Sequence, residues 1–150
     1  MVRIIALIVM YLVSQLIGAQ TTKNSDKNFE KSVKENMTIT VTVPNIPSDT
    51  GTVRFALYTK DSFLLQPIAA QIGKIKEGYS VILFKNVMAG EYAVVCFHDS
   101  NSNEKLDFED NGIPKESFGT SNNVLLMGPP NFEDAKFIVT NKSLDLTIKF

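Results

Sequence analysis

Hydrophobic and polar residues alternate strictly at both ends of the main part of the chain. From Thr38 to Val43, Ile and Val occupy every second position and threonines stand between them. A period of two is typical of a strand with one buried and one exposed face. The same alternation closes the chain, where the apolar positions are Leu144, Leu146, Ile148 and Phe150.

Turn residues divide the remainder into further short elements. Besides 38–43 and 144–150, we predict strands over residues 52–58, 79–87, 91–97, 124–127 and 135–140. Pro67 would interrupt a helix, so residues 61–78 are predicted to form a long connection with one or two helical turns. A long loop is expected from Asp99 to about Asn123.

About seven short strands with little helix predict an all-β fold built as a two-sheet sandwich. A small outer-membrane barrel is the alternative, but it needs strands that are apolar outside and polar inside. The strand at 91–97 is apolar on both faces, which favours a buried strand of a sandwich. The side chains predicted to face inward are Ile39, Val41, Phe55, Leu57, Val94 or Val95, Phe137, Val139, Leu146 and Ile148.

The first nineteen residues have the features of a signal peptide. Arg3 precedes an apolar run from Ile4 to Val13, and the small residues Gly18 and Ala19 offer a cleavage site. The uncharged run is short for a membrane-spanning helix, which is the alternative. We therefore predict a signal peptide over 1–19, a flexible polar leader over 20–36 and a β-sandwich domain over 37–150. The mature protein would be exported, periplasmic or secreted, and not stably inserted in a membrane.

Charge and cysteine content exclude some functions. The formal net charge is −1, so the chain has no electrostatic reason to bind nucleic acid. Cys96 is the only cysteine in the sequence, which rules out an intramolecular disulfide. It lies within an apolar run and is expected to be a small buried hydrophobe.

The segment from Asp99 to Asp110 has the ligand spacing of an EF-hand calcium loop. A hard cation prefers six to eight oxygen ligands, and alternate residues of a tight loop can supply them. The predicted ligands are the side chains of Asp99, Asn101, Asn103, Asp107 and Asp110, with the backbone carbonyl of Lys105.

Two residues depart from that calcium pattern. Glu104 stands where glycine usually allows a sharp turn, at a cost on the order of 1 kcal/mol. Asp110 is shorter than the usual bidentate Glu. The alternative is a surface loop rich in Asx turns, whose side chains cap their own backbone. If calcium binds, it neutralises the clustered carboxylates and stiffens the loop.

His98 is the only histidine of the sequence. A hydrolase would need it as a base, but the adjacent Asp99 points to the opposite face if the strand continues. One His and one buried Cys are too few ligands for zinc. We expect a strand-end histidine that orders the loop by a hydrogen bond, and we predict no catalytic residues.

Several segments together resemble a bacterial family known as domain of unknown function 2141. They are Gly90–Asp99, Asn101, Asn103, Leu106–Asp107, Asn111–Glu116, Phe118–Gly119, Ser121–Asn123, Gly128–Phe132 and Asp134–Ala135. The resemblance covers most of residues 38–150. It implies an exported sandwich of the immunoglobulin-like or transthyretin-like kind, with no established activity and no catalytic residues to carry over.

We therefore expect an exported, non-enzymatic binding or envelope-associated module. Its partner would be a protein, a glycan or a small ligand held at the long loop, with calcium as the one cofactor considered. Two alternatives stay open: a small periplasmic hydrolase using His98 and loop carboxylates, and a purely structural envelope protein acting through exposed strand edges.

Overall fold

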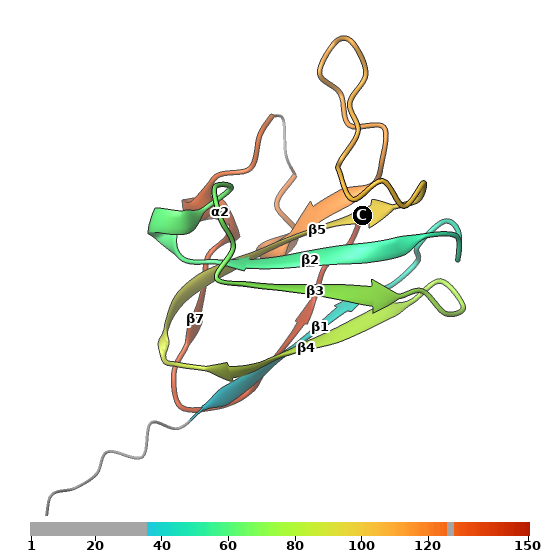
Figure 1. The fold of residues 1–150 in the computed structure, drawn as a ribbon. Helices are drawn as coiled ribbons and strands as arrows, with labels where there is room; N and C mark the ends of the chain where they lie inside the picture. Colours follow the sequence, from blue (N-terminus) through green and yellow to red (C-terminus); the bar gives the residue numbers. More distant parts are fainter. Residues whose placement is uncertain (1–35, 126–127) are drawn as a thin grey trace, which may run out of the picture. The chain divides into compact units, whose positions relative to one another are not determined.

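A computed structural model describes residues 36–125 and 128–150 of the chain (Figure 1). The predicted signal peptide and residues 20–35 of the predicted leader lie outside the described residues. Two sheets pack face to face. One contains β1 (Met37–Val43), β4 (Ser80–Val87) and β8 (Leu144–Thr147), in the order β4-β1-β8.

The larger sheet has the order β3-β2-β5-β6. Its strands are β2 (Thr52–Tyr58), β3 (Ala69–Lys74), β5 (Gly90–Asp99) and β6 (Phe118–Thr120). The short strand β7 (Phe137–Val139) also pairs with β5, at residues 90–92. The predicted two-sheet, all-β sandwich is confirmed.

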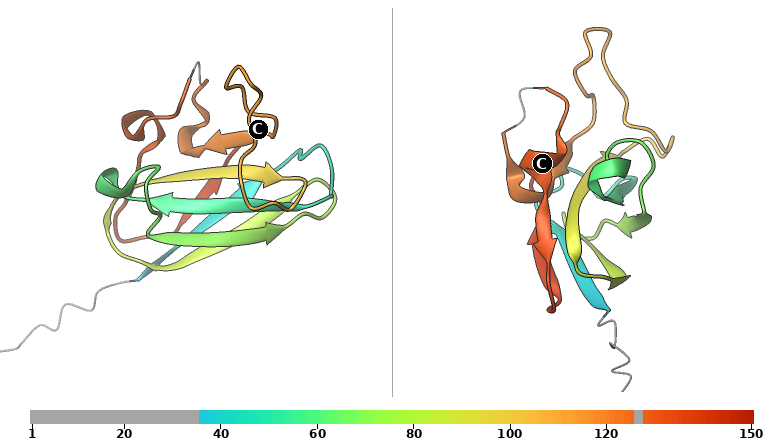
Figure 2. Two further views of the ribbon diagram at one scale, coloured as in Figure 1. Left: turned by 45° about the horizontal axis from the view of Figure 1, so that its top comes forward. Right: turned by 90° about the vertical axis from the view of Figure 1, so that its left-hand side faces the viewer.

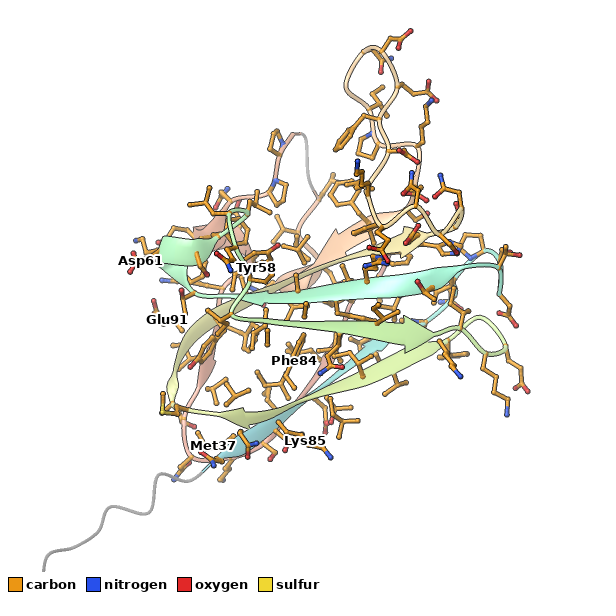
Figure 3. All side chains as sticks on the ribbon, viewed as in Figure 1. Met37, Tyr58, Asp61, Phe84, Lys85 and Glu91 are labelled. Carbon is orange, nitrogen blue, oxygen red and sulfur yellow. The ribbon has the colours of Figure 1, made fainter. Side chains whose placement is uncertain are left out.

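The core fills the space between the sheets and follows the alternation in the sequence. In β1, all four odd-numbered positions are buried and the threonines between them are half-buried. In β4, Phe84 is buried between the sheets, while Lys85 projects from the outer side (Figure 3). The predicted inward residues are buried with one exception: Leu146 is only partly buried and packs against the core. Val94, not Val95, is the buried member of its pair.

The first and last strands hold the smaller sheet together. β8 pairs with β1 in parallel, with Val41 opposite Leu146, whereas the other ladders among residues 36–125 and 128–150 are antiparallel. Regular strand ends at Thr147, short of the predicted Phe150, but the Ile148 amide still donates to the Thr42 carbonyl at 2.9 Å. The residues after Thr147 therefore still contribute a buried side chain, Ile148, to the core, although they form no regular strand.

Two of the secondary-structure predictions are wrong. The segment 61–78 was predicted as a connection with one or two helical turns, and a 3₁₀ turn, η1 (Lys60–Ser62), does form at its start, but the strand β3 then follows. The sequence of β3, Ala-Ala-Gln-Ile-Gly-Lys, lacks the β-branched alternation that marks a strand, and backbone pairing with β2 decides its conformation. No strand forms at Val124 and Leu125, and the other two residues of that prediction lie outside the described ones. Leu125 is 85% exposed and pairs with no strand.

The predicted loop 99–123 is interrupted by secondary structure. β5 extends to Asp99, and β6 returns at Phe118 to pair with it. A 3₁₀ turn, η2 (Ser121–Asn123), follows. The helix α2 (Phe132–Ala135) is one turn long, and the Asn131 side chain caps it by accepting from the Asp134 amide at 2.9 Å. No helix among the described residues is long and apolar enough to cross a membrane.

Candidate functional site

The loop between β5 and β6 stands out from the larger sheet as a projecting arm (Figure 1, and Figure 2, right). Its outer part is a small hairpin, in which Phe108 and Pro114 form an isolated β-bridge. The Gly112 amide donates to the Glu109 carbonyl at 2.8 Å, and Gly112 has a φ of 82°. A glycine allows this left-handed turn without steric cost.

Asp99 anchors the inner part of the loop. Its carboxylate is only 1% exposed and accepts from Arg54 Nε at 2.7 Å. The backbone amides of Asn103 and Glu104 also donate to it, at 3.0 and 3.1 Å. Burial acts to raise the pKa of the Asp99 carboxyl, but these hydrogen bonds outweigh burial and hold its pKa below the ordinary value. Asp99 is therefore an ionised, fully paired anchor.

Three of the predicted calcium ligands come together at the next level of the loop. The side-chain amides of Asn101 and Asn103 both donate to Asp107 Oδ2, at 2.7 and 2.8 Å. Their oxygens turn the other way, because Asn101 Oδ1 accepts from the Asn103 amide and Asn103 Oδ1 from the Lys105 amide. These are Asx turns, as the alternative interpretation of the loop expected.

Asp110 does not join the other predicted ligands. It lies in the tip of the hairpin, beyond the bridge between Phe108 and Pro114. Within the described residues, no three His, Cys, Asp or Glu side chains are grouped so that they could hold a metal ion. A hard cation at this loop would therefore draw on the amide oxygens of Asn101 and Asn103 as well as on Asp107.

Glu104 occupies the position where the calcium-loop pattern has glycine. Its φ is 70°, so the turn there requires the left-handed conformation although the residue has a side chain. Glu104 Oε1 accepts from Arg54 Nη2 at 2.9 Å. Arg54 thus joins a buried carboxylate and an exposed one, and it ties the loop to the face of β2.

Glu116 braces the loop from its other end. This carboxylate accepts from both the amide and the hydroxyl of Ser100, at 2.9 and 3.0 Å. Its second oxygen accepts from the Asp107 amide at 3.3 Å. Glu116 is buried, and its hydrogen bonds hold the start of the loop against its end.

His98 and Cys96 are both placed in the interior. His98 Nε2 lies 2.7 Å from the Thr50 carbonyl oxygen. Because a carbonyl only accepts, that ring nitrogen carries the proton. Asp99 lies on the opposite face of β5, since it pairs with Thr52 while His98 pairs with Val53. Burial raises the pKa of the Cys96 thiol far above its ordinary value. His98 thus makes a hydrogen bond at the end of the strand, as predicted, but to the segment before β2 and not to the loop that begins at Asp99.

Sequence reasoning missed a hollow on the outer face of the larger sheet. Its volume is about 640 Å³. Across β3, β2 and β5, the outward side chains form rows, because directly paired residues share a face of the sheet. One row is Ile72, Arg54 and Phe97, and the next is Ala70, Ala56 and Val95.

The hollow exists because small side chains lie between large ones. Ala56 and Ala70, in the second row, leave space. Arg54 and Phe97 lie at one end of this space and Tyr58 at the other. The side chain of Glu104, from the projecting loop, also lines it. The Tyr58 hydroxyl is a neutral hydrogen-bonding group at pH 7, as tyrosines ordinarily are, and burial raises its pKa further. The hollow could not be predicted because β3 was not predicted, and the register of β3 places Ala70 and Ile72 in the lining.

The Ser-Asn-Asn segment that follows β6 is a structural joint. The Ser121 hydroxyl accepts from the Val94 amide at 3.0 Å and donates to the Ala135 carbonyl. Asn122 Nδ2 donates to two carbonyls at the end of α2, and Asn123 bonds Thr147 and Lys149. The motif therefore links the two sheets and α2.

The fold and this site define an all-β sandwich with an acidic loop tied to one sheet and an open hollow beside that loop. Its sequence matches, over residues 41–147, the family DUF2141, described as uncharacterised protein conserved in bacteria. The chain belongs to this family, and the resemblance noted from its motifs is confirmed. No curated protein matches it.

Proposed function

We propose that this protein is an exported, non-enzymatic binding module. The hollow on the outer face of β3, β2 and β5, together with the loop that overhangs it, is the binding surface. The observation that carries this proposal is the lining: two alanines form an apolar floor, with charged and aromatic side chains at the ends. A concave apolar surface with a few polar groups is the usual form of a ligand site, and its volume lies in the usual range.

The chemistry of the nucleophilic and basic side chains favours binding over catalysis. The protonated Nε2 of His98 is engaged by a backbone carbonyl. The Cys96 thiol is buried and kept neutral, whereas a nucleophilic cysteine needs a lowered pKa. The Glu116 carboxylate is occupied by three donors from the loop.

Saturable binding of the neutral fluorescent dye Nile red tests the hollow. Ala70→Phe places a ring over the floor from an exposed position of the edge strand β3 and should abolish dye binding. Val81→Phe is the matched control, because Val81 is exposed on the outer face of the other sheet. Dye binding that survives Ala70→Phe, or that is lost equally in Val81→Phe, would reject the hollow as the site.

Calcium forms the second part of the proposal, as an ion that orders the loop. Support comes from the convergence of Asn101, Asn103 and Asp107, and from the left-handed Glu104 at the position where the ligand spacing requires it. Rotation of the two amides would present their oxygens toward the carboxylate, and a bound cation would replace the amide donors.

A melting curve tests the calcium proposal. We expect a dissociation constant of roughly 10⁻⁴–10⁻³ M. Free calcium at ten times that constant should raise the free energy of unfolding by about 1.4 kcal/mol. Magnesium should raise it less. Asp107→Asn should remove the effect while leaving the anchor at Asp99 intact, and Glu104→Gly should enhance it. A wild-type curve that is the same in chelator and in about 10 mM calcium, well above that range, contradicts the proposal.

Export is tested separately by mass spectrometry of the native protein. The proposal expects a mature N-terminus at or near Gln20, after the small residues that suit a signal peptidase. Recovery of the intact Met1 form from the cytoplasm would contradict it.

A further inference from the structure

The electrostatics of the hollow limit what it can hold. Arg54 is 23% exposed, and its guanidinium is already paired with the buried Asp99 and with Glu104. One positive charge therefore faces two carboxylates. Glu104 is 71% exposed, so its carboxylate remains open to a further partner at the rim of the hollow.

The loop around Glu104 carries the same sign of charge. Between Asp99 and Glu116 the chain has six carboxylates and two lysines. Asp99 and Glu116 are buried, which leaves four carboxylates and two lysines on the outer part of the loop, and Glu104 is the carboxylate among them that lines the hollow. A net negative charge beside the hollow attracts a cation and repels an anion before contact is made. An anionic ligand would have to displace Glu104 from Arg54 against this field.

Aromatic rings complete the lining. Phe97 lies in the row with Arg54, and Tyr58 lies two residues from Ala56 on the same face of β2. The faces of such rings attract ammonium and guanidinium groups, by about 0.5–1 kcal/mol at exposed sites. Tyr58 is four positions after Arg54 in the extended strand, so their Cα atoms are roughly 13 Å apart.

From these features we infer that the hollow binds a small organic cation, with an apolar body lying over Ala56 and Ala70 and an amine or guanidine group at Glu104. This inference rests on the proposed binding function and adds the chemical class of the ligand. The apolar body supplies burial on the floor of the sheet. The carboxylate of Glu104 and the neighbouring ring select the charge of the head group.

Three probes with one body and different head groups test this inference: 4-phenylbutylamine, 4-phenylbutanol and 4-phenylbutyrate. Each is titrated into protein produced from the full chain, at low salt, and followed by NMR shifts of the backbone amides. The amine should bind about tenfold more tightly than the alcohol, which is the combined effect of one exposed ion pair and one cation–π contact. The butyrate should bind more weakly than the alcohol.

Two variants separate the head group from the body. Glu104→Gln should bring the affinity for the amine to within about threefold of the affinity for the alcohol, since the ion pair is lost. Glu109→Gln, a change of the same charge in the same loop but outside the lining, should leave the preference for the amine intact. Added salt should reduce the preference as well, because the pair is partly exposed.

The outcomes distinguish the two levels of the proposal. Equal binding of amine and alcohol, or tighter binding of the butyrate, overturns the cation inference and leaves the hollow as a binding site. Binding of the amine that Ala70→Phe does not change places the cation elsewhere and overturns the inference. Failure of all three probes to bind overturns both the inference and the proposed function.

Discussion

Replacing Arg54 with methionine tests how the loop is held on the sheet. Methionine keeps an unbranched stem against β2 and removes the charge. The Asp99 carboxylate, 1% exposed, would then retain only the amides of Asn103 and Glu104 as donors. A hydrogen bond to a charged group contributes about 1.5–3 kcal/mol, and breaking a buried ion pair costs about 3–5 kcal/mol.

The expected loss of stability in Arg54→Met is smaller than that for breaking a buried ion pair and larger than that for breaking a surface pair. Because Arg54 is partly exposed, water can enter and solvate the Asp99 carboxylate, so we expect the free energy of unfolding to fall by about 2–3 kcal/mol. For a domain of this size that corresponds to a melting temperature lower by roughly 8–12 °C. Urea unfolding at pH 7 measures the loss directly.

Two further variants show whether the Asp99 charge causes the loss. Glu104→Gln removes only the exposed pair and should cost less than about 1 kcal/mol. Adding Asp99→Asn to Arg54→Met removes the unpaired charge and should recover at least about 1 kcal/mol, within the range found for coupled neighbours. A loss below about 0.5 kcal/mol in Arg54→Met, the surface range, would refute the anchor, as would an equal loss in Glu104→Gln.

Three other predictions concern the core and the loop. Phe137→Ala should lower the free energy of unfolding by about 3 kcal/mol, as for a buried ring, and urea unfolding would show it. Gly119→Ala should lower the free energy of unfolding by about 1–3 kcal/mol, because the added Cβ would lie 2.7 Å from the Lys149 carbonyl oxygen. Gly128→Ala is the control: its Cβ would meet no atom within 4 Å, so its free energy of unfolding should stay within about 0.5 kcal/mol of wild type. The lowered pKa of Asp99 adds stability that is complete above its unfolded pKa of about 3.9 and is lost as the pH falls through the folded value; acid titration of stability below pH about 4 should therefore be shallower in Arg54→Met.

The strands that could be predicted are those in which apolar and polar residues alternate because one face is buried and the other is exposed. β1 and β2 appear in the sequence as strict alternation, because each has one face in the core. β3 and β6 could not be found this way. β3 has only Gly73 buried, and β6 has three residues, too few to show a period. Likewise nothing local indicates that β8 pairs with β1 in parallel, since that ladder joins the two ends of the domain.

The candidate site was predictable only in part for a similar reason. The spacing of Asp99, Asn101, Asn103 and Asp107 identified a loop whose polar side chains turn inward and bond to one another and to its backbone. The glycine position of the calcium pattern, occupied by Glu104, correctly marked a left-handed turn. The partner of Asp99 was not predictable, because Arg54 lies 45 positions earlier in the chain. The hollow was missed with β3, whose register supplies Ala70 and Ile72.

Glu104 belongs to both parts of the proposed site, and this connects them energetically. Its backbone amide donates to Asp99 inside the loop, and its carboxylate lines the hollow. A cation held by Asn103 and Asp107 would fix the backbone adjacent to Glu104 and so reduce the conformational freedom that a ligand at the hollow must otherwise restrict. Coupling of this kind is reciprocal. Whatever factor calcium contributes to the affinity of the hollow, a ligand in the hollow must contribute to the affinity for calcium.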